Sequence, residues 1–270
     1  RYEKKIVKSP GKTEVVLVKD LFPDNPIQGG DMDFPIVEEA MACEQVETKK
    51  IEDLMKTAVK FGFIGGGQAG GKILEHFYQQ GYRRVLAVNT TAQDFSGLNY
   101  ENKLLIGSNT GAGKDPNEGF KAATQDREKI LRACREAFGP EVEHIMEVVA
   151  SAGGSGSGSC EVLIDIAKQY LRSLNKEEKI GVIVALPKET EGQRAKENSE
   201  RLLGKLKEQV SNKEISPFVV ADNERILKLY PRVSISKFFE IANKSVTSMF
   251  NMFNHLSAQD SPYMTLDSAD

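Results

Sequence analysis

Residues Ala152-Gly-Gly-Ser-Gly-Ser-Gly-Ser159 form a glycine and serine run that decides the fold. The run follows an apolar stretch, His144–Ala150, and leads into a helical pattern, Val162–Leu171. A loop between a strand and a helix N-terminus offers free backbone N–H groups and the positive end of the helix dipole to an anion. Gly/Ser runs are also typical of flexible linkers. The periodic apolar flanks favour a folded anion site instead.

A second glycine loop, Gly65-Gly-Gly-Gln-Ala-Gly-Gly71, follows another short apolar strand. Gly65, Gly67 and Gly70 formally match the G-x-G-x-x-G dinucleotide fingerprint. That fingerprint also requires an acidic residue at the end of the next strand, where it binds a ribose. The next strand, Arg84–Val88, ends in Asn-Thr-Thr. A nicotinamide-dependent oxidoreductase is therefore a distant alternative.

Apolar segments and helical patterns alternate from residue 60 onward. Alternation of this kind predicts an α/β fold, a Rossmann-like parallel sheet with helices on both faces. The predicted strands span about 60–65, 84–89, 103–106, 144–150, 179–186 and 216–221. The predicted helices include 116–138, 158–174, 191–210 and a long final helix at about 235–258.

A third glycine loop, Gly111–Gly119, lies between a predicted strand and a helix whose first turn suits Pro116. All three loops follow strands of one βα series, so they meet at the carboxyl edge of the sheet, where open α/β sheets bind ligands. Three phosphate-facing loops at one edge suggest a triphosphate.

The chain resembles the tubulin/FtsZ superfamily of GTPases from Lys60 to Asp270. Four segments are similar to the family's phosphate loops in family order: Gly65–Lys72, Ala87–Asp94, Gly111–Gly119 and Ala152–Ser159. Four later segments match the ribose loop, the base-side loop, the core helix and the catalytic loop: Leu186–Gly192, Ala221–Arg225, Phe239–Asn243 and Thr265–Asp270. The amino-acid sequences of Phe61–Gly65 and Leu186–Glu189 most resemble the TubZ-like branch of plasmids and phages, although the first loop is closer in length to FtsZ.

The resemblance implies a GTP and GDP site with phosphate contacts from three loops. The implied phosphate ligands are Gly66, Gly67, Gln68, Ala69, Gly70, Gly71, Gly111, Ala112, Gly113, Gly153, Gly154, Ser155, Gly156, Ser157 and Gly158. Gly111–Gly113 corresponds to the loop that senses the γ-phosphate.

Ribose and base contacts are implied by four further positions. Glu191 aligns with the ribose ligand, although an acid at a helix N-terminus also suits the dipole, and both roles are compatible. Asn223 and Asn243 carry amides that supply the donor and acceptor that guanine requires, and Phe239 is placed to stack on the purine. Lys72 stands where the family often has Asn or Cys, so it is not counted as base-specific.

Asp267 and Asp270 match the two acidic positions of the family's catalytic loop, while Thr265 replaces its Asn. In the family this loop reaches the nucleotide of the next subunit, which implies hydrolysis completed in trans with Mg²⁺ offsetting the developing charge. A preceding helix of roughly 24 residues spans about 36 Å, which separates these aspartates from their own nucleotide. No side chain is assigned to the metal.

The sequence divides into four expected parts. Residues 1–57 form an N-terminal extension with a possible strand at Thr13–Lys19 and a helical stretch at Val37–Lys60. It either folds against the core or docks on a neighbouring subunit or a partner. Residues 58–232 form the GTP-binding domain, 233–262 the central core helix and 263–270 the catalytic acidic loop. The C-terminal activation domain of the family is absent from this sequence.

Composition limits the functional classes. The formal net charge of −3 gives no electrostatic case for direct binding to nucleic acid or to a membrane, and no apolar stretch approaches the roughly 18 residues of a spanning helix. Cys43, Cys134 and Cys160 are widely spaced, which suggests a reducing compartment. The expected location is the cytoplasm of a bacterial cell, including a phage-infected host.

The resemblance leaves several functions open. The first is a self-assembling cytomotive GTPase that forms head-to-tail filaments for phage or plasmid DNA positioning, with a DNA-bound adaptor or another phage or plasmid component as partner. The second is an FtsZ-like cell-division protein. The third is a GTP-binding structural or regulatory component that does not polymerise.

Overall fold

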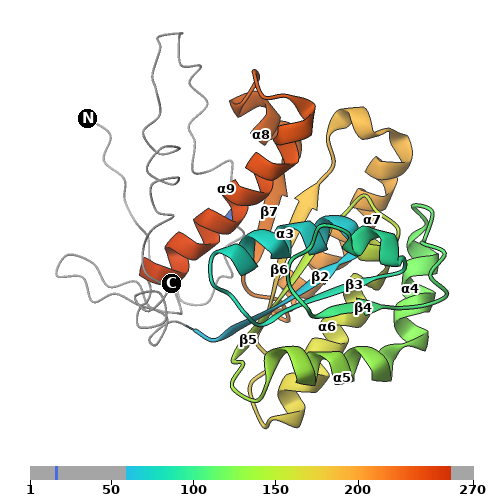
Figure 1. Cartoon of the computed structure of the whole chain (residues 1–270), viewed down its shortest axis with the longest axis vertical. Coiled ribbons are helices and arrows are strands. Elements are labelled where there is room, and N and C mark those ends of the chain that lie inside the picture. The colour runs from blue at the N-terminus through green and yellow to red at the C-terminus, as the bar shows by residue number, and fades with distance from the viewer. Residues whose placement is uncertain (1–15, 18–58, 257–270) are drawn as a thin grey trace.

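The computed structural model describes residues 16–17 and 59–256, and its centre is a parallel sheet (Figure 1). The strand order is β1-β7-β6-β5-β2-β3-β4, and every neighbouring pair is parallel. The predicted α/β class with a Rossmann-like sheet is confirmed. The strands are β1 Val16–Leu17, β2 Phe61–Gly66, β3 Val85–Asn89, β4 Lys103–Leu105, β5 His144–Ala150, β6 Ile180–Leu186 and β7 Phe218–Asp222.

Helices cover both faces of the sheet, as predicted (Figure 1). α3 (Gly67–Gln79) and α9 (Ile235–Leu256) pack on one face, where Phe63, Phe77 and Val246 share a core cluster. The other face carries the larger cluster, which is covered by α4 Pro116–Gln125, α5 Arg127–Phe138, α6 Ser155–Ser173 and α7 Gln193–Ser211. The remaining elements are the 3₁₀ turns η3 Ala92–Phe95 and η4 Glu189–Glu191, and α8 Asn223–Leu229.

Two helix boundaries differ from the sequence-based prediction. The single helix expected at 116–138 is wrong, because Asp126 ends α4 and precedes α5. The Asp126 carboxylate accepts a hydrogen bond from the Gly107 backbone N–H at 2.7 Å, which anchors the chain where a continuous helix would run on. α6 begins at Ser155, three residues before the predicted start, so the glycine run itself forms its first turns.

The N-terminal extension contributes one described strand. β1 lies inside the predicted strand Thr13–Lys19 and extends the sheet beside β7, with Val16 paired with Val219 and Leu17 with Val220. The helical stretch predicted at Val37–Lys60 falls almost entirely outside the described residues, and so does the acidic loop at 263–270. The predicted domain boundaries stay predictions. No helix in the described ranges has the length and apolar character to cross a membrane.

Glu147 lies in the centre of strand β5, where its neighbours along the strand are apolar. Its side chain is 1% exposed, and neither carboxyl oxygen has a hydrogen-bond partner within residues 59–256. The carboxyl lies against the first glycine loop, because a Cβ on Gly66 would stand 2.9 Å from its Oε1. Burial raises the pKa of Glu147 well above its ordinary value. A neutral carboxylic acid therefore sits directly behind the loops.

Glu147→Gln is expected to stabilise the chain increasingly as the pH rises. The folded wild-type chain keeps a proton that the unfolded chain releases above its ordinary pKa of about 4.3. The free energy of unfolding of the wild type is therefore not reduced by Glu147 ionisation below that pH. It falls by about 1.4 kcal/mol per pH unit as the pH rises from there toward the pKa of the folded state. The neighbouring thiols of Cys134 and Cys160 do not interfere, since burial raises the pKa of Cys134 to about 12 and that of Cys160 well above its usual value.

Urea unfolding at several pH values between about 5 and 8 measures this difference. Glu136→Gln, an exposed position on α5, is the matched control. Parallel pH curves for wild type and Glu147→Gln would contradict the assignment of a buried neutral acid.

Candidate functional site

The loops that follow β2, β3, β4 and β5 meet at the carboxyl edge of the sheet, as the sequence predicts. Thr90 Oγ1, after β3, lies 2.6 Å from Ser155 Oγ, after β5. The Gly111 backbone N–H, in the loop after β4, donates to the Thr90 carbonyl at 3.1 Å. These bonds join three loops into one surface.

The helices that begin at the first loop and at the signature run have uncapped N-termini. α3 and α6 start after Gly66 and Gly154, with no side-chain cap and no acidic residue in the first turn. By contrast, α4 is capped by Asp115 and α8 by Asp222, while α5 and α7 also lack a side-chain cap. An uncapped helix start presents unpaired N–H donors and positive dipole potential, which is the arrangement that binds a phosphate. Gln68–Gly71, expected in the first loop, instead lies in the first turn of α3.

Several signature glycines are required by the packing of loop on loop. A Cβ on Gly156 would lie 2.5 Å from the Gly66 carbonyl oxygen, and one on Gly154 would lie 2.7 Å from the Asp115 backbone nitrogen. A Cβ on Gly158 would collide with the Pro116 carbonyl oxygen. The absence of side chains here lets the run contact the first and third loops through backbone atoms.

Other glycines face open space. A Cβ on Gly153 or Gly113 would meet nothing within 4 Å, and one on Gly111 would only touch Thr91 at 4.0 Å. Gly111 and Gly113 adopt positive φ angles of 74° and 53°, which glycine adopts without strain. At these three positions the packing leaves room for further atoms beside the loops.

Asp94 links the second loop to the first turn of α3. Its carboxylate accepts a hydrogen bond from Asn89 Nδ2 at 2.8 Å and one from Gln68 Nε2 at 3.1 Å. The Asn89 amide oxygen in turn accepts the Thr90 backbone N–H at 2.7 Å. Gln68 is thus held at the edge of the α3 N-terminus.

Glu191 closes the turn that precedes α7. Its Oε1 accepts the Lys188 backbone N–H at 3.0 Å, and its own N–H donates to the Lys188 carbonyl at 3.0 Å. The side chain is exposed, so one carboxylate oxygen stabilises the turn while the other remains available to solvent or to a ribose.

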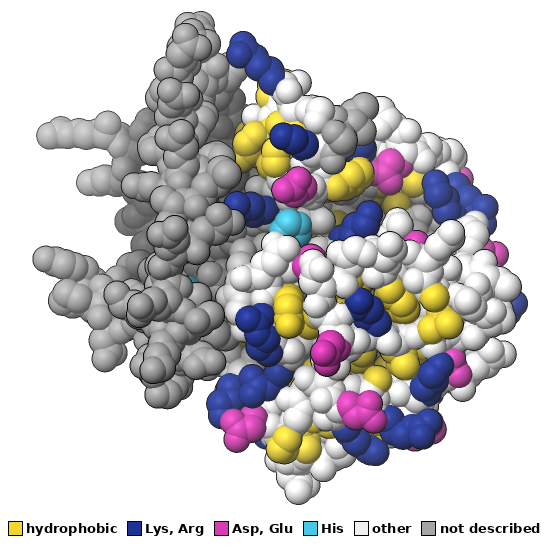
Figure 2. Space-filling view, viewed as in Figure 1, with side chains coloured by type: hydrophobic (Ala, Val, Ile, Leu, Met, Phe, Trp, Pro, Cys, Tyr) yellow, Lys and Arg dark blue, Asp and Glu magenta, His cyan; other side chains and the backbone are white. Residues whose placement is uncertain are grey.

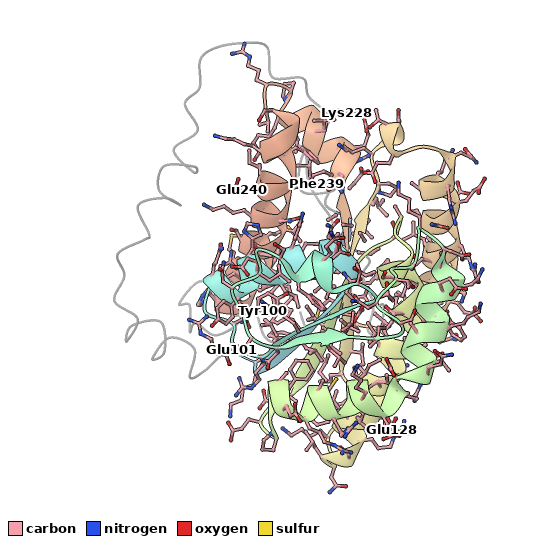
Figure 3. The ribbon with its side chains drawn as sticks, turned by 45° about the vertical axis from the view of Figure 1, so that its right-hand side comes forward. Tyr100, Glu101, Glu128, Lys228, Phe239 and Glu240 are labelled. Carbon is pink, nitrogen blue, oxygen red and sulfur yellow. The ribbon has the colours of Figure 1, made fainter. Side chains whose placement is uncertain are left out.

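The base-side residues lie on α8 and α9, which pack together through Ile226, Phe238 and Ala242. Asn223 begins α8, Asn243 is half-buried on α9, and Phe239 lies on α9 at the end nearer α8 (Figure 3). The Phe239 ring is 43% exposed.

Lys188, which the sequence analysis did not single out, is placed beside these rings. Its ammonium lies 4.8 Å from the ring centroid of Phe239 and 5.2 Å from that of Phe238, a cation–π arrangement. Nothing in the Pro-Lys-Glu sequence around Lys188 signals such a contact. The other lysine near the predicted site, Lys72, is exposed on α3.

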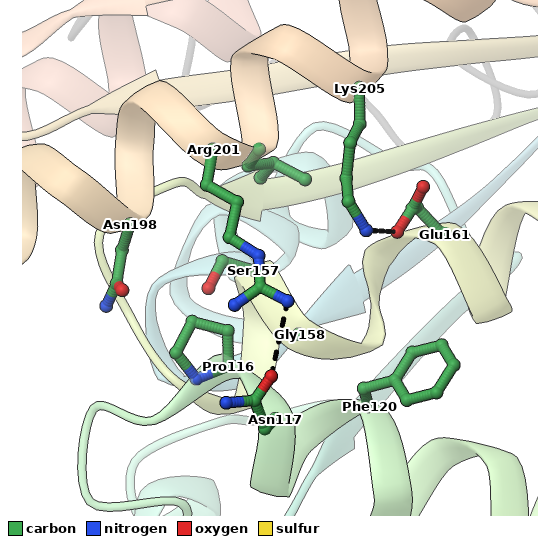
Figure 4. Close-up of a pocket in the computed structure, with 10 residues that line it drawn as sticks. Pro116, Asn117, Phe120, Ser157, Gly158, Glu161, Asn198, Arg201 and Lys205 are labelled. Atoms are coloured by element: carbon green, nitrogen blue, oxygen red, sulfur yellow. Dashed lines mark hydrogen bonds and ion pairs between the residues drawn. The ribbon is translucent and has the colours of Figure 1, made fainter.

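A cavity of about 230 Å³ lies between α4, α6 and α7, next to the third glycine loop and the signature run (Figure 4). Asn117 and Ser157 come from the helices that follow the third loop and the signature run, and Asn198, Arg201 and Lys205 come from α7. Arg201 Nη2 donates to Asn117 Oδ1 at 3.2 Å, and Lys205 pairs with Glu161. This face of the site is polar.

The surface around the site carries mixed charge. Figure 2 shows Lys and Arg side chains interspersed with Asp and Glu over the visible face. Within the described ranges, no group of three His, Cys, Asp or Glu residues is arranged to hold a metal ion. The two predicted catalytic aspartates, Asp267 and Asp270, lie outside these ranges.

Comparison with known proteins gives several matches. The model of the Tubulin/FtsZ family, GTPase domain, matches residues 60–231. Cell division protein FtsZ 1 of Methanocaldococcus jannaschii is 26% identical over 230 residues, which cover 82% of this chain and 57% of that protein. The first relatives found are archaeal FtsZ proteins, and the chain spans about half their length, 50% to 57%.

Two solved structures are similar in fold. A GTPγS-bound protofilament of CetZ2 from Haloferax volcanii matches with a TM-score of 0.63 and 26% identity, over 76% of this chain and 60% of that one. A GTPγS-form protofilament of TubZ from Bacillus thuringiensis serovar israelensis matches with a TM-score of 0.64, over 78% and 60% of the two chains. Its identity of 19% shows the fold alone.

The predicted family is therefore confirmed, while the TubZ-like branch stays a prediction. The family match covers more than half of the sequence and contains the strand ends, the open glycines and the uncapped helix starts described above. The chain belongs to the tubulin/FtsZ family, of which it carries the GTPase domain.

Proposed function

We propose that this chain binds GTP and GDP and that the protein hydrolyses GTP within a self-assembled filament. The observation that carries the proposal is the pair of uncapped helix N-termini, α3 and α6, that begin in glycine loops on the neighbouring strands β2 and β5. Two such sites side by side suit consecutive phosphates of one nucleotide. The CetZ2 protofilament, which is 26% identical to this chain, is bound to GTPγS, and this supports the same ligand.

The phosphate roles follow from the open positions. The α- and β-phosphates are assigned to the N–H groups at the starts of α3 and α6, with Gly153 facing them. The γ-phosphate is assigned to Gly111–Gly113, in which Gly111 and Gly113 adopt positive φ angles. The Gly111 N–H already donates to the Thr90 carbonyl, so the proposed phosphate donors are the N–H groups of Ala112 and Gly113. Mg²⁺ would be bound mainly by phosphate oxygens and water, where it offsets the charge that develops during phosphoryl transfer.

The base and ribose roles follow from the α8 and α9 side. Asn223 and Asn243 are proposed to pair with the guanine edge, Phe239 to stack on the purine and Glu191 to accept the ribose hydroxyls. Lys188 now covers one face of Phe239 at 4.8 Å. A purine stacked on that same face would displace the ammonium toward the base edge.

The catalytic step is proposed to occur between subunits. α9 contains 22 residues and spans about 33 Å at 1.5 Å per residue. The C-terminal end of α9 at Leu256 is therefore far from the base-side end of the helix, and Asp267 and Asp270, which come later in the sequence, are proposed to orient water on a neighbour's nucleotide. Dimer and protofilament neighbours support self-association.

The cellular role is open between several proposals. The proposal of phage or plasmid DNA positioning, with a DNA-bound adaptor, rests on the TubZ-like sequences of Phe61–Gly65 and Leu186–Glu189. Cell division rests on the archaeal FtsZ relatives. A non-polymerising GTP-binding component is the third, and a cytoplasmic location is proposed for all three. Light scattering of the complete protein with GTP separates the first two roles from the third.

Gly153→Val is expected to abolish GTP and GDP binding without unfolding the chain. Its Cβ enters open space on the ligand side, so the branched side chain occupies the volume that phosphate oxygens need. Calorimetric titration and thermal unfolding measure the two effects. Gly204→Val, an open position on α7, is the control. Gly154→Val and Gly156→Val are less informative, because backbone atoms lie within 2.5–2.7 Å of the new Cβ and the loops must shift.

Asn243→Ala is expected to weaken GDP by about tenfold or more while leaving the weak binding of ADP nearly unchanged. A site that pairs with the polar edge of its ligand discriminates strongly against analogues that leave those groups unpaired. Lys244→Ala, the adjacent exposed residue of α9, is the control. Equal wild-type affinity for GTP and ATP would contradict guanine recognition.

Asp270→Ala in the complete protein is expected to keep GTP binding and assembly and to lose turnover, which gives long-lived polymers. Because the aspartates act on a neighbour, specific GTPase activity of the wild type should rise with protein concentration. Asp260→Ala, which precedes the acidic loop in the sequence, serves as the control. Turnover that does not depend on concentration would place the catalytic groups within one subunit.

A further inference from the structure

We propose that Asn198 is a positioning residue that locks the γ-phosphate loop against the signature run. The inference rests on the proposed nucleotide site and concerns a helix, α7, that contributes no phosphate ligand to it. Figure 4 shows Asn198 on α7, opposite the first turns of α4 and α6.

One amide group bridges two loops. Asn198 Nδ2 donates to the Lys114 carbonyl at 3.0 Å and to the Ala152 carbonyl at 3.1 Å. Lys114 ends the open part of the third loop, and Ala152 begins the signature run. A carboxamide nitrogen carries two hydrogens, so both donors are used and the two loops are held at a fixed separation.

The bridged carbonyl of Lys114 belongs to a strained backbone. Lys114 has a φ of 60° and follows Gly113, whose φ is 53°. A left-handed conformation is unfavourable at a residue with a Cβ and persists only where surrounding contacts impose it. The Asn198 donor and the turn bond from the Asp115 N–H to the Ala112 carbonyl, at 2.7 Å, are two such contacts.

α7 is itself held firmly enough to serve as the support. Ser199 Oγ lies 2.8 Å from Ser151 Oγ at the end of β5, and both side chains are buried. One turn farther along the helix, Arg201 donates to Asn117 in the first turn of α4 at 3.2 Å. Asn198 therefore fixes the loop assigned to the γ-phosphate relative to the rigidly held helix α7.

The test uses Asn198→Asp, which keeps the shape but replaces both donors by acceptors, and Asn198→Ala, which removes them without adding charge. Calorimetry gives the affinity for GDP and for GTPγS. We expect both variants to weaken GTPγS binding by about tenfold, because the Lys114 backbone of the third loop loses a supporting bond. The signature run keeps the Ser151–Ser199 contact beside it and its own glycine contacts. GDP affinity should change by no more than about twofold. Asn212→Asp, the C-cap of α7, is the matched control.

Each outcome has one meaning. Selective loss of GTPγS affinity, with a thermal unfolding midpoint close to that of wild type, supports the positioning role. Equal loss for both nucleotides, or no loss for either, overturns it while the proposed function stands, because wild type binds both. A wild-type chain that binds neither nucleotide overturns the proposed function and this inference with it.

Discussion

Backbone-to-backbone contact between the three glycine loops is the constraint on which the rest of the structure depends. Gly156 rests on the Gly66 carbonyl, Gly154 on the Asp115 nitrogen and Gly158 on the Pro116 carbonyl, each with no room for a Cβ. Because these contacts run from the signature run to both other loops, α3, α4 and α6 start from one compact unit. The uncapped starts of α3 and α6 both belong to this unit. The positions of the helix starts that we propose as the anion site are thus a product of how the loops fit one another.

This packing constraint divides the glycines of the loops into two groups with different roles. The sequence-based prediction assigned most of the loop glycines to phosphate, since a strand, a glycine run and a helix pattern follow one another three times. The structure separates the glycines that permit loop packing, such as Gly156, from those such as Gly153 that face open space. That distinction depends on which backbone atoms from distant segments lie nearby. Spacing along one chain carries no information about it.

The same limit explains what else the sequence could and could not predict. Continuous apolar runs predicted the buried strands because parallel strands are covered on both faces. The break at Asp126 was missed because its cause is a bond to Gly107, nineteen positions earlier. Asn198 was missed because an asparagine within a helical pattern looks like any surface residue. Its two carbonyl partners, Lys114 and Ala152, come from loops far away in sequence.

Unfavourable features gather around these loops. Both carboxyl oxygens of Glu147 lie without a hydrogen-bond partner behind Gly66 within residues 59–256, and Lys114 holds a left-handed backbone in the third loop. A buried carboxyl without a partner and a strained loop both cost stability. Both are tolerated because the sheet and α7 determine the surrounding backbone through many other bonds. A loop held this way has few alternative conformations, so its donors are in position before a ligand arrives, and little binding energy is lost in ordering them.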